Sequence, residues 1–183
     1  MIKLAMFDLD GTLFDTEKAN YLAYKQACGE EFPVDEEFFR LHCMSRSYKA
    51  FLPKLGVPET RFKEIHDKKI ECYPHYLSSV RKNETLFDIA AALKSTGAKL
   101  CIVTTASRKN TEQLLNQFEC ADLFDLLVTQ EVVTKQKPAP DSYLYAMEYY
   151  NAKPGECVIF EDSETGLKAA EATGAPIYCI TKF

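Results

Sequence analysis

The sequence predicts an α/β protein whose doubly wound, parallel sheet is interrupted near its start by an all-helical insertion. Over the second half of the chain, short apolar runs alternate with amphipathic runs, which is typical of parallel strands joined by crossover helices. Between residues 16 and 79, by contrast, apolar residues recur at helical spacing without a convincing strand pattern. A chain of 183 residues is long enough to bury one substantial core with a modest insertion.

The elements of the α/β part follow one another in a regular order. The first strand is the apolar run that ends at Phe7. Four helix-then-strand pairs follow in the second half, with helical patterns at residues 86–93, 114–118, 144–147 and 167–170 and apolar strands at residues 100–103, 126–128, 157–160 and 177–180. Between the first strand and these pairs we expect helices at residues 21–28, 36–41, 47–55 and 61–73, separated by Gly and Pro. The predicted division is a core of residues 1–15 and 80–183 and a helical insertion of residues 16–79.

Composition excludes several classes of function. A formal net charge of −5 and a pI near 5.3 argue against nucleic-acid binding, because phosphate backbones are held by clustered Lys and Arg. No apolar run approaches the length of a membrane span, and the chain starts with a strand instead of a leader, which predicts a soluble, cytoplasmic protein. The seven cysteines form no Cys-x-x-Cys pair, and several lie in apolar runs, so we expect buried thiols instead of disulfides or zinc.

Two carboxylates follow the first strand directly. Asp8 and Asp10 are two positions apart, so in extended chain they point the same way, and Gly11 lets the backbone turn beside them. The carboxyl ends of parallel strands are where such sheets hold their chemistry. One carboxylate could attack a reacting centre while the other moves a proton. A solvated turn has the same composition and is the alternative at this point.

Three further polar segments follow later strands. Thr104 and Thr105, ahead of a helix capped by Ser107, suit a phosphoryl group, although the hydroxyls could merely cap the helix. Lys137, which Pro138 holds extended, could neutralise carboxylates and phosphate, or it could be a solvated loop charge.

The third of these segments is acidic. Glu161 and Asp162 come directly after the strand at residues 157–160. Carboxylate oxygens are ligands that Mg²⁺ prefers, so this pair could hold the ion. Helix capping by Asp162 or by the neighbouring Ser163 is the alternative.

Taken together, the order of these segments resembles the haloacid dehalogenase-like hydrolase superfamily. The motifs are Asp-x-Asp-Gly-Thr, Thr after a strand, Lys-Pro and Glu-Asp-Ser-x-x-Gly, and the resemblance covers the whole chain. It implies a Rossmann-like core. The insertion resembles the small helical cap of the β-phosphoglucomutase-like and phosphoglycolate-phosphatase-like branch.

The resemblance implies a role for each site residue. Asp8 would be the nucleophile that forms an aspartyl-phosphate, and Asp10 the general acid and base. Thr104 would donate a hydrogen bond to a phosphoryl oxygen, with Thr105 as the alternative, and Lys137 would balance charge around Asp8 and the phosphate.

The same resemblance implies a Mg²⁺ site. Asp162, the Asp8 carboxylate and the backbone carbonyl of Asp10 would ligate the ion, and Glu161 would act on it through a water. Gly11, together with Thr105, is a further candidate contact to substrate.

Candidate substrate residues also lie in the insertion. The segment Cys43-Met44-Ser45-Arg46 resembles a loop reading Gly-x-Ser-Arg in β-phosphoglucomutase-like proteins, where it grips a distal phosphate or sugar, although Cys43 departs from the glycine. Alternatively, Ser45 caps the next helix and Arg46 is exposed. Asn20 stands where the mutase carries a histidine, which favours a phosphatase over a mutase.

Two lysines of the insertion raise a different chemistry. Phosphonatases of the superfamily use a cap lysine as a Schiff base, and Lys68 and Lys69 lie in the insertion. Because nothing in the sequence marks either lysine as desolvated, we expect both to be solvated helix charges.

The implied function is a Mg²⁺-dependent phosphatase that hydrolyses a small phosphorylated metabolite through an aspartyl-phosphate. The first alternative is a β-phosphoglucomutase-type phosphotransferase. The second is a noncatalytic phospho-acceptor or binding module, which would need neither Asp10 nor a large cap. We expect no nucleic-acid or membrane partner, and the sequence leaves the natural substrate and the oligomeric state open.

Overall fold

The computed structural model describes residues 1–43 and 46–181 of the chain. It divides into two compact units. The first, the α/β unit, comprises residues 1–15 and 81–183, and the second, the helical unit, comprises residues 16–80.

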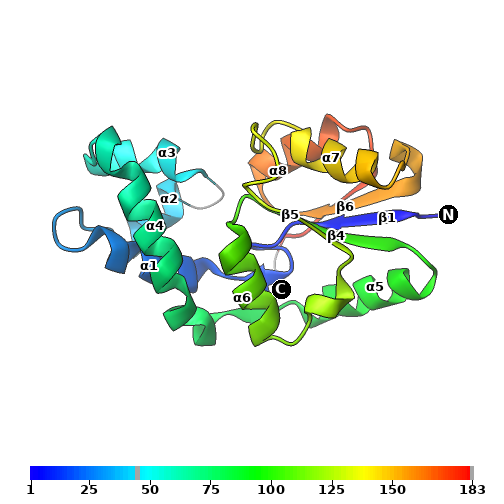
Figure 1. Ribbon diagram of the computed structural model, residues 1–183, viewed down its shortest axis with the longest axis horizontal. Coiled ribbons are helices and arrows are strands. Elements are labelled where there is room, and N and C mark those ends of the chain that lie inside the picture. The colour runs from blue at the N-terminus through cyan, green and yellow to red at the C-terminus, as the bar shows by residue number, and fades with distance from the viewer. Residues whose placement is uncertain (44–45, 182–183) are drawn as a thin grey trace. The chain divides into compact units, whose positions relative to one another are not determined.

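A five-stranded parallel sheet forms the centre of the α/β unit (Figure 1). Its strands are β1 (Leu4–Phe7), β4 (Lys99–Val103), β5 (Leu126–Val128), β6 (Cys157–Glu161) and β7 (Ile177–Cys179), in the order β5-β4-β1-β6-β7. Every neighbouring pair is parallel. The predicted parallel sheet is therefore confirmed.

Helices cover both faces of this sheet. They are α5 (Glu84–Ser95), α6 (Arg108–Gln117), α7 (Asp141–Tyr149) and α8 (Glu164–Glu171), with short 3₁₀ turns η4 (Ala121–Leu123) and η5 (Pro154–Glu156) between elements. Figure 1 shows α7 and α8 on one face and α5 and α6 on the other. The sheet is doubly wound, as predicted, because the helices before β4 and β5 cover one face and the helices before β6 and β7 cover the other.

The central strands are buried on both faces, which is why they read as continuous apolar runs. Leu4 and Met6 belong to the core on the side of α7 and α8. Phe7 points to the opposite face, where its ring stacks on Phe160 at 4.7 Å and meets Phe124 edge-on. Because alternate residues of a strand face opposite sides of the sheet, Asp8, the residue after Phe7, lies on the side of α7.

A two-stranded antiparallel ribbon marks the border between the two units in the sequence. It pairs β2 (Phe14–Asp15) with β3 (Arg81–Lys82) and includes an ion pair of 2.5 Å between Asp15 and Arg81. Asn83, the N-cap of α5, donates from its backbone to Leu13 O and from its side chain to Thr12 O. The start of α5 is thereby fixed to the loop after β1.

The helical unit consists of helices and 3₁₀ turns among its described residues. They are α1 (Glu17–Cys28), α2 (Glu36–His42), α3 (Tyr48–Phe51), η1 (Leu52–Leu55), η2 (Glu59–Arg61), α4 (Phe62–Cys72) and η3 (Tyr73–Ser79). Its core is largely aromatic and includes Tyr24, Phe39 and Phe51 with Leu52 and Ile65. The predicted all-helical insertion is confirmed.

Two expectations from composition can be compared with the described residues. All seven cysteines are free thiols, and six are buried as expected, whereas Cys179 is exposed at the edge strand β7. Within residues 1–43 and 46–181, none of the helices combines the length and apolar character that a membrane crossing requires.

Candidate active site

The loop after β1 carries the first pair of predicted site residues. The backbone of Asp8 donates to Phe160 O at 2.9 Å, so the chain stays attached to β6 one residue beyond the strand. In the sheet, Met6 pairs with Ile159, and two residues later Asp8 and Glu161 lie on the same face. The strand register thus brings together two carboxylates that are far apart in the sequence.

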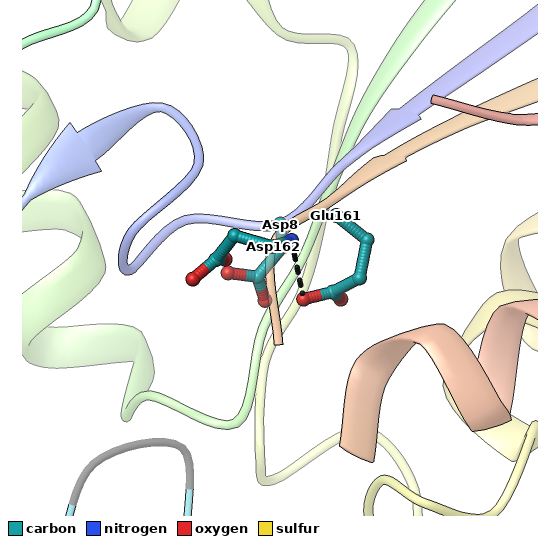
Figure 2. Close-up of side chains that lie close together, drawn as sticks. All are labelled: Asp8, Glu161 and Asp162. Atoms are coloured by element: carbon teal, nitrogen blue, oxygen red, sulfur yellow. Dashed lines mark hydrogen bonds between the residues drawn. The ribbon is translucent and has the colours of Figure 1, made fainter. Parts of the chain in front are cut away.

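Three carboxylates form what we call the acidic cluster: Asp8, Glu161 and Asp162. One oxygen from each lies within 4.8 Å of the others, as Figure 2 illustrates. Asp162 accepts a hydrogen bond of 2.7 Å from the Thr12 hydroxyl. Gly11 has a φ of +90°, and a Cβ there would overlap the Asp162 carboxylate. Glycine at this position therefore allows the positive φ of the turn and leaves room for the Asp162 carboxylate.

Lys137 reaches the acidic cluster from the loop before α7. Its ammonium donates to Asp8 Oδ1 at 2.6 Å, to Glu161 Oε2 at 2.7 Å and to the carbonyl of Val103 at 2.9 Å. The side chain is 4% exposed, so the alternative of a solvated loop charge is wrong. The peptide bond between Lys137 and Pro138 is cis.

Glu161 is fully buried, and five donors hold its carboxylate. Oε2 accepts from Lys137 and, at 2.6 Å, from the hydroxyl of Tyr143. Oε1 accepts from the backbone of Asp162 and from the backbone and hydroxyl of Ser163. A Cβ at Gly166 would overlap this carboxylate, so the glycine leaves it room.

The electrostatics of the cluster follow from burial and from an excess of negative charge. Burial and the neighbouring Glu161 raise the pKa of Asp8 well above its usual range, although Lys137 opposes the shift. The pKa of Asp162 is raised to about 6, mainly by burial, with Glu161 and Asp10 adding to the shift and the Thr12 hydrogen bond opposing it. Within the residues that the structure describes, these three carboxylates contact one ammonium, that of Lys137, so the cluster carries excess negative charge when all three are ionised. This donor set fits a hard divalent cation such as Mg²⁺.

Thr104 and Thr105 follow β4 and differ in burial. Thr104 is buried, donates its backbone N–H to Val128 O and accepts at its hydroxyl from the backbone of Ala106. As the acceptor in that bond, the hydroxyl keeps its own proton for another partner. Thr105 is exposed. Ser107 caps α6 as predicted, by accepting from the backbone of Asn110.

Two residues that contact the cluster were given no role in the sequence analysis. Thr12 lies inside the Asp-x-Asp-Gly-Thr motif, and only the structure shows its bond to Asp162. Tyr143 looks like any core aromatic of a helix, yet its hydroxyl reaches Glu161. Glu131, in the loop after β5, accepts from the backbone of Arg108 and from Thr129, which fixes the start of α6.

The candidate substrate residues of the insertion belong to the helical unit. The Arg46 side chain is exposed, whereas Ser45 lies outside the described residues. The N-cap of α3 is Ser47, and the alternative of helix capping by Ser45 falls on a residue outside the described ones. Cys43 is buried in the core of the helical unit. Asn20 donates its side-chain amide to the Thr16 hydroxyl at 3.1 Å.

The two lysines of α4 have different environments. Lys68 is exposed, as expected. Lys69 is buried, with its ammonium 4.5 Å from the ring centroid of Tyr73 and 5.4 Å from that of Tyr24. The expectation of a solvated charge is wrong for Lys69, because it lies on the same face of α4 as the buried Ile65 and Cys72.

Comparisons with known proteins identify the family of the chain. The family model described as haloacid dehalogenase-like hydrolase matches residues 5–180. The chain is 28% identical over 182 residues to a phosphorylated carbohydrates phosphatase of Thermotoga maritima, covering 94% of this chain and 82% of that protein. It is also 28% identical over 185 residues to a β-phosphoglucomutase of Bacillus subtilis, covering 94% and 80%.

A solved structure extends the agreement to the fold. The crystal structure of CbbY from Rhodobacter sphaeroides, in complex with phosphate, superposes with a TM-score of 0.87 and 26% identity, covering 97% of this chain and 85% of that one. The family model spans almost the entire chain, including Asp8, Lys137, Glu161 and Asp162. The chain therefore belongs to the haloacid dehalogenase-like hydrolase family.

Proposed function

We propose that this protein is a Mg²⁺-dependent phosphatase that hydrolyses a small phosphorylated metabolite through an aspartyl-phosphate on Asp8. The observation that carries the proposal is the buried ion pair of Asp8 and Lys137 inside a cluster with excess negative charge. Burial of a charge that has no compensating partner is costly. Here the imbalance leaves room for a divalent cation and for the phosphoryl group that accompanies it.

Asp8 is the proposed nucleophile because it is the carboxylate that Lys137 holds at the end of the central strand β1. An Asp8 oxygen attacks phosphorus, and the bond from phosphorus to the substrate's alkoxy oxygen breaks. Attack of an anion on an anionic ester needs neighbouring positive charge and donors. Lys137 provides charge from one side, and the Thr104 hydroxyl keeps a proton that it can donate to a phosphoryl oxygen.

Asp10 is the proposed general acid and base. Its protonated carboxyl gives a proton to the departing alkoxide, and its carboxylate then takes a proton from the water that attacks the aspartyl-phosphate. Phosphate leaves and the Asp8 carboxylate is restored. Asp10 follows Asp8 by two residues and is less buried than Asp8, which suits a group that exchanges protons with substrate and water.

The carboxylates of Asp8 and Asp162, with the backbone carbonyl of Asp10, would hold the Mg²⁺. When bound, the ion supplies positive charge beside the phosphoryl oxygens. Both oxygens of Glu161 already accept hydrogen bonds, which supports contact between Glu161 and the ion through a water. Glu161 then acts mainly by holding Lys137 and the backbone of Asp162.

Phosphorylated sugars are the first substrate class to examine. One relative is named a phosphorylated carbohydrates phosphatase, and the crystal structure of a similar protein, CbbY, holds phosphate. The helical unit would serve as a cap that excludes bulk water from the phosphorylated Asp8. Within it, Arg46 and Ser45 are proposed to contact the substrate beyond its phosphate, and Gly11 and Thr105 to contact it from the α/β unit.

The test is turnover of p-nitrophenyl phosphate with Mg²⁺ and with excess chelator, followed by a panel of sugar phosphates. We expect phosphate release that depends on Mg²⁺ and is lost in Asp8→Asn. A noncatalytic phospho-acceptor would bind Mg²⁺ without turnover. Steady hydrolysis by Asp8→Asn would contradict the covalent route.

A β-phosphoglucomutase-type phosphotransferase is the second candidate, and the similarity to the Bacillus subtilis mutase favours it. The assay is β-glucose 1-phosphate with a trace of the bisphosphate, in which both products are measured. We expect phosphate release with little glucose 6-phosphate, because Asn20 lacks the titratable ring with which the mutase restrains water attack. Rapid glucose 6-phosphate formation with negligible phosphate release would establish the mutase instead.

A further inference from the structure

We infer that Tyr143 is a positioning residue whose hydroxyl holds Glu161 so that Lys137 remains directed at Asp8. This inference rests on the proposed function, because it assigns to Tyr143 a part in preparing the proposed nucleophile. The hydroxyl itself contacts Glu161 and is separated from Asp8 by Lys137.

The first step of the argument is that one ammonium serves two carboxylates. Lys137 donates to Asp8 Oδ1 at 2.6 Å and to Glu161 Oε2 at 2.7 Å, and its third donor is used by Val103 O. All three hydrogens are therefore engaged. Any increase in the attraction between Lys137 and Glu161 must weaken the contact between Lys137 and Asp8.

The second step is that Tyr143 donates to Glu161 Oε2, the oxygen that competes with Asp8 for the Lys137 ammonium. Its hydroxyl lies 2.6 Å from Glu161 Oε2, in a fully buried environment. A charge-assisted bond of this length takes up part of the negative charge on that oxygen. The attraction between Glu161 and Lys137 is therefore weaker, and the attraction between Lys137 and Asp8 is stronger.

The third step is that the phenol remains a donor. Burial raises the pKa of Tyr143 well above its usual range, and the adjacent Glu161 adds to the shift against the opposing charge of Lys137. The ring of Tyr143 makes a separate cation–π contact, because the Lys137 ammonium lies 4.8 Å from the ring centroid. Replacement by phenylalanine keeps the ring and removes only the hydroxyl.

The experiment compares Tyr143→Phe with the wild type, using p-nitrophenyl phosphate and saturating Mg²⁺. We expect kcat to fall roughly tenfold, the size of effect typical of one hydrogen bond to a charged group. The KM and the Mg²⁺ concentration for half-maximal activity should change less than about twofold, because the hydroxyl donates to neither substrate nor the proposed direct ligands. Tyr145→Phe, on the same helix with an exposed side chain, is the matched control and should match the wild type.

A second measurement separates positioning from general support of the core. In a Glu161→Gln background the competing negative charge is gone, so Tyr143→Phe should lower kcat much less than it does in the wild type. Equal effects in both backgrounds would overturn the inference, as would a wild-type kcat in Tyr143→Phe. So would a loss of kcat that is matched by a large fall in the unfolding midpoint and a rise in KM.

The inference and the proposed function fail in different ways. If the wild type hydrolyses neither p-nitrophenyl phosphate nor any sugar phosphate, the proposed function is wrong. If the wild type is active and Tyr143→Phe is equally active, the proposed function stands and the role of Tyr143 is wrong.

Discussion

The α/β unit and the helical unit, in the parts that the structure describes, both contain a buried lysine beside tyrosine, Lys137 in one and Lys69 in the other. In the α/β unit, Lys137 lies near the ring of Tyr143 and donates to two carboxylates. In the helical unit, Lys69 lies near the rings of Tyr24 and Tyr73. Aromatic faces can accommodate a buried cation in a packed core. What marks the α/β unit as the candidate active site is therefore the acidic cluster that contacts Lys137.

The largest expected effect comes from removing the anionic partner of Lys137. Asp8→Asn keeps the shape of the side chain and loses the attacking charge, so kcat on p-nitrophenyl phosphate should fall by roughly 10⁴-fold or more. The circular dichroism spectrum should remain close to that of the wild type. Mg²⁺ binding measured by calorimetry should weaken by no more than the roughly 10- to 100-fold expected for Asp162→Asn, because each variant exchanges one proposed carboxylate ligand for an amide oxygen. If Asp8→Asn kept more than a few per cent of the wild-type activity, the ion pair of Lys137 with Asp8 would not mark a catalytic site, and Lys137 would no longer differ from Lys69 in this respect.

Removal of Lys137 itself should have the next largest effect on catalysis. Lys137→Met should lower kcat by roughly 10²- to 10³-fold, as loss of one preorganised charged donor typically does. Two buried carboxylates also lose their partner, so the free energy of unfolding measured in urea should fall by about 3–5 kcal/mol. A variant that loses stability without losing activity would make Lys137 as purely structural as we expect Lys69 to be.

The carboxylates can be ranked by their need for Mg²⁺. Asp162→Asn should raise the Mg²⁺ concentration for half-maximal activity by roughly 10- to 100-fold, because an oxygen of this side chain is proposed to ligate the ion directly. Glu161→Gln should raise it less, since the Glu161 oxygens are occupied by hydrogen bonds. Equal shifts in the two titrations would contradict this ordering.

The smallest effect is expected for the lysine of the helical unit. Lys69→Met retains most of the aliphatic volume and removes the cation that faces the tyrosine rings. We expect the free energy of unfolding to change by about 1 kcal/mol and kcat and KM to stay within about twofold of the wild type. A kcat loss comparable to that of Lys137→Met would show that Lys69 also takes part in chemistry.

The sequence predicted the site best where strand ends determine it. Asp8 and Asp162 directly follow strands β1 and β6, Lys137 lies in the loop after β5, and parallel strands place their carboxyl ends at one edge of the sheet. The proximity of Asp8 and Glu161 further depends on the register that pairs Met6 with Ile159, and no local pattern encodes that register.

Features that depend on distant packing could not be predicted. Tyr143 is a core aromatic by its spacing, and only the position of β6 places Glu161 beside its hydroxyl. Lys69 looked like a helix surface charge because the rings that cover it come from α1 and η3. The ribbon of β2 and β3 was missed because two-residue strands carry no detectable period.

That ribbon has a consequence for how the protein could be rebuilt. Asp15 and Arg81 are directly paired across it, and they are the last residue before the helical unit and the first residue after it. Two residues in this relation can be joined by a two-residue β-hairpin turn such as Asn-Gly. The 65 residues of the helical unit could thus be excised, or exchanged for another domain, through a junction that leaves every strand of the five-stranded sheet in its register.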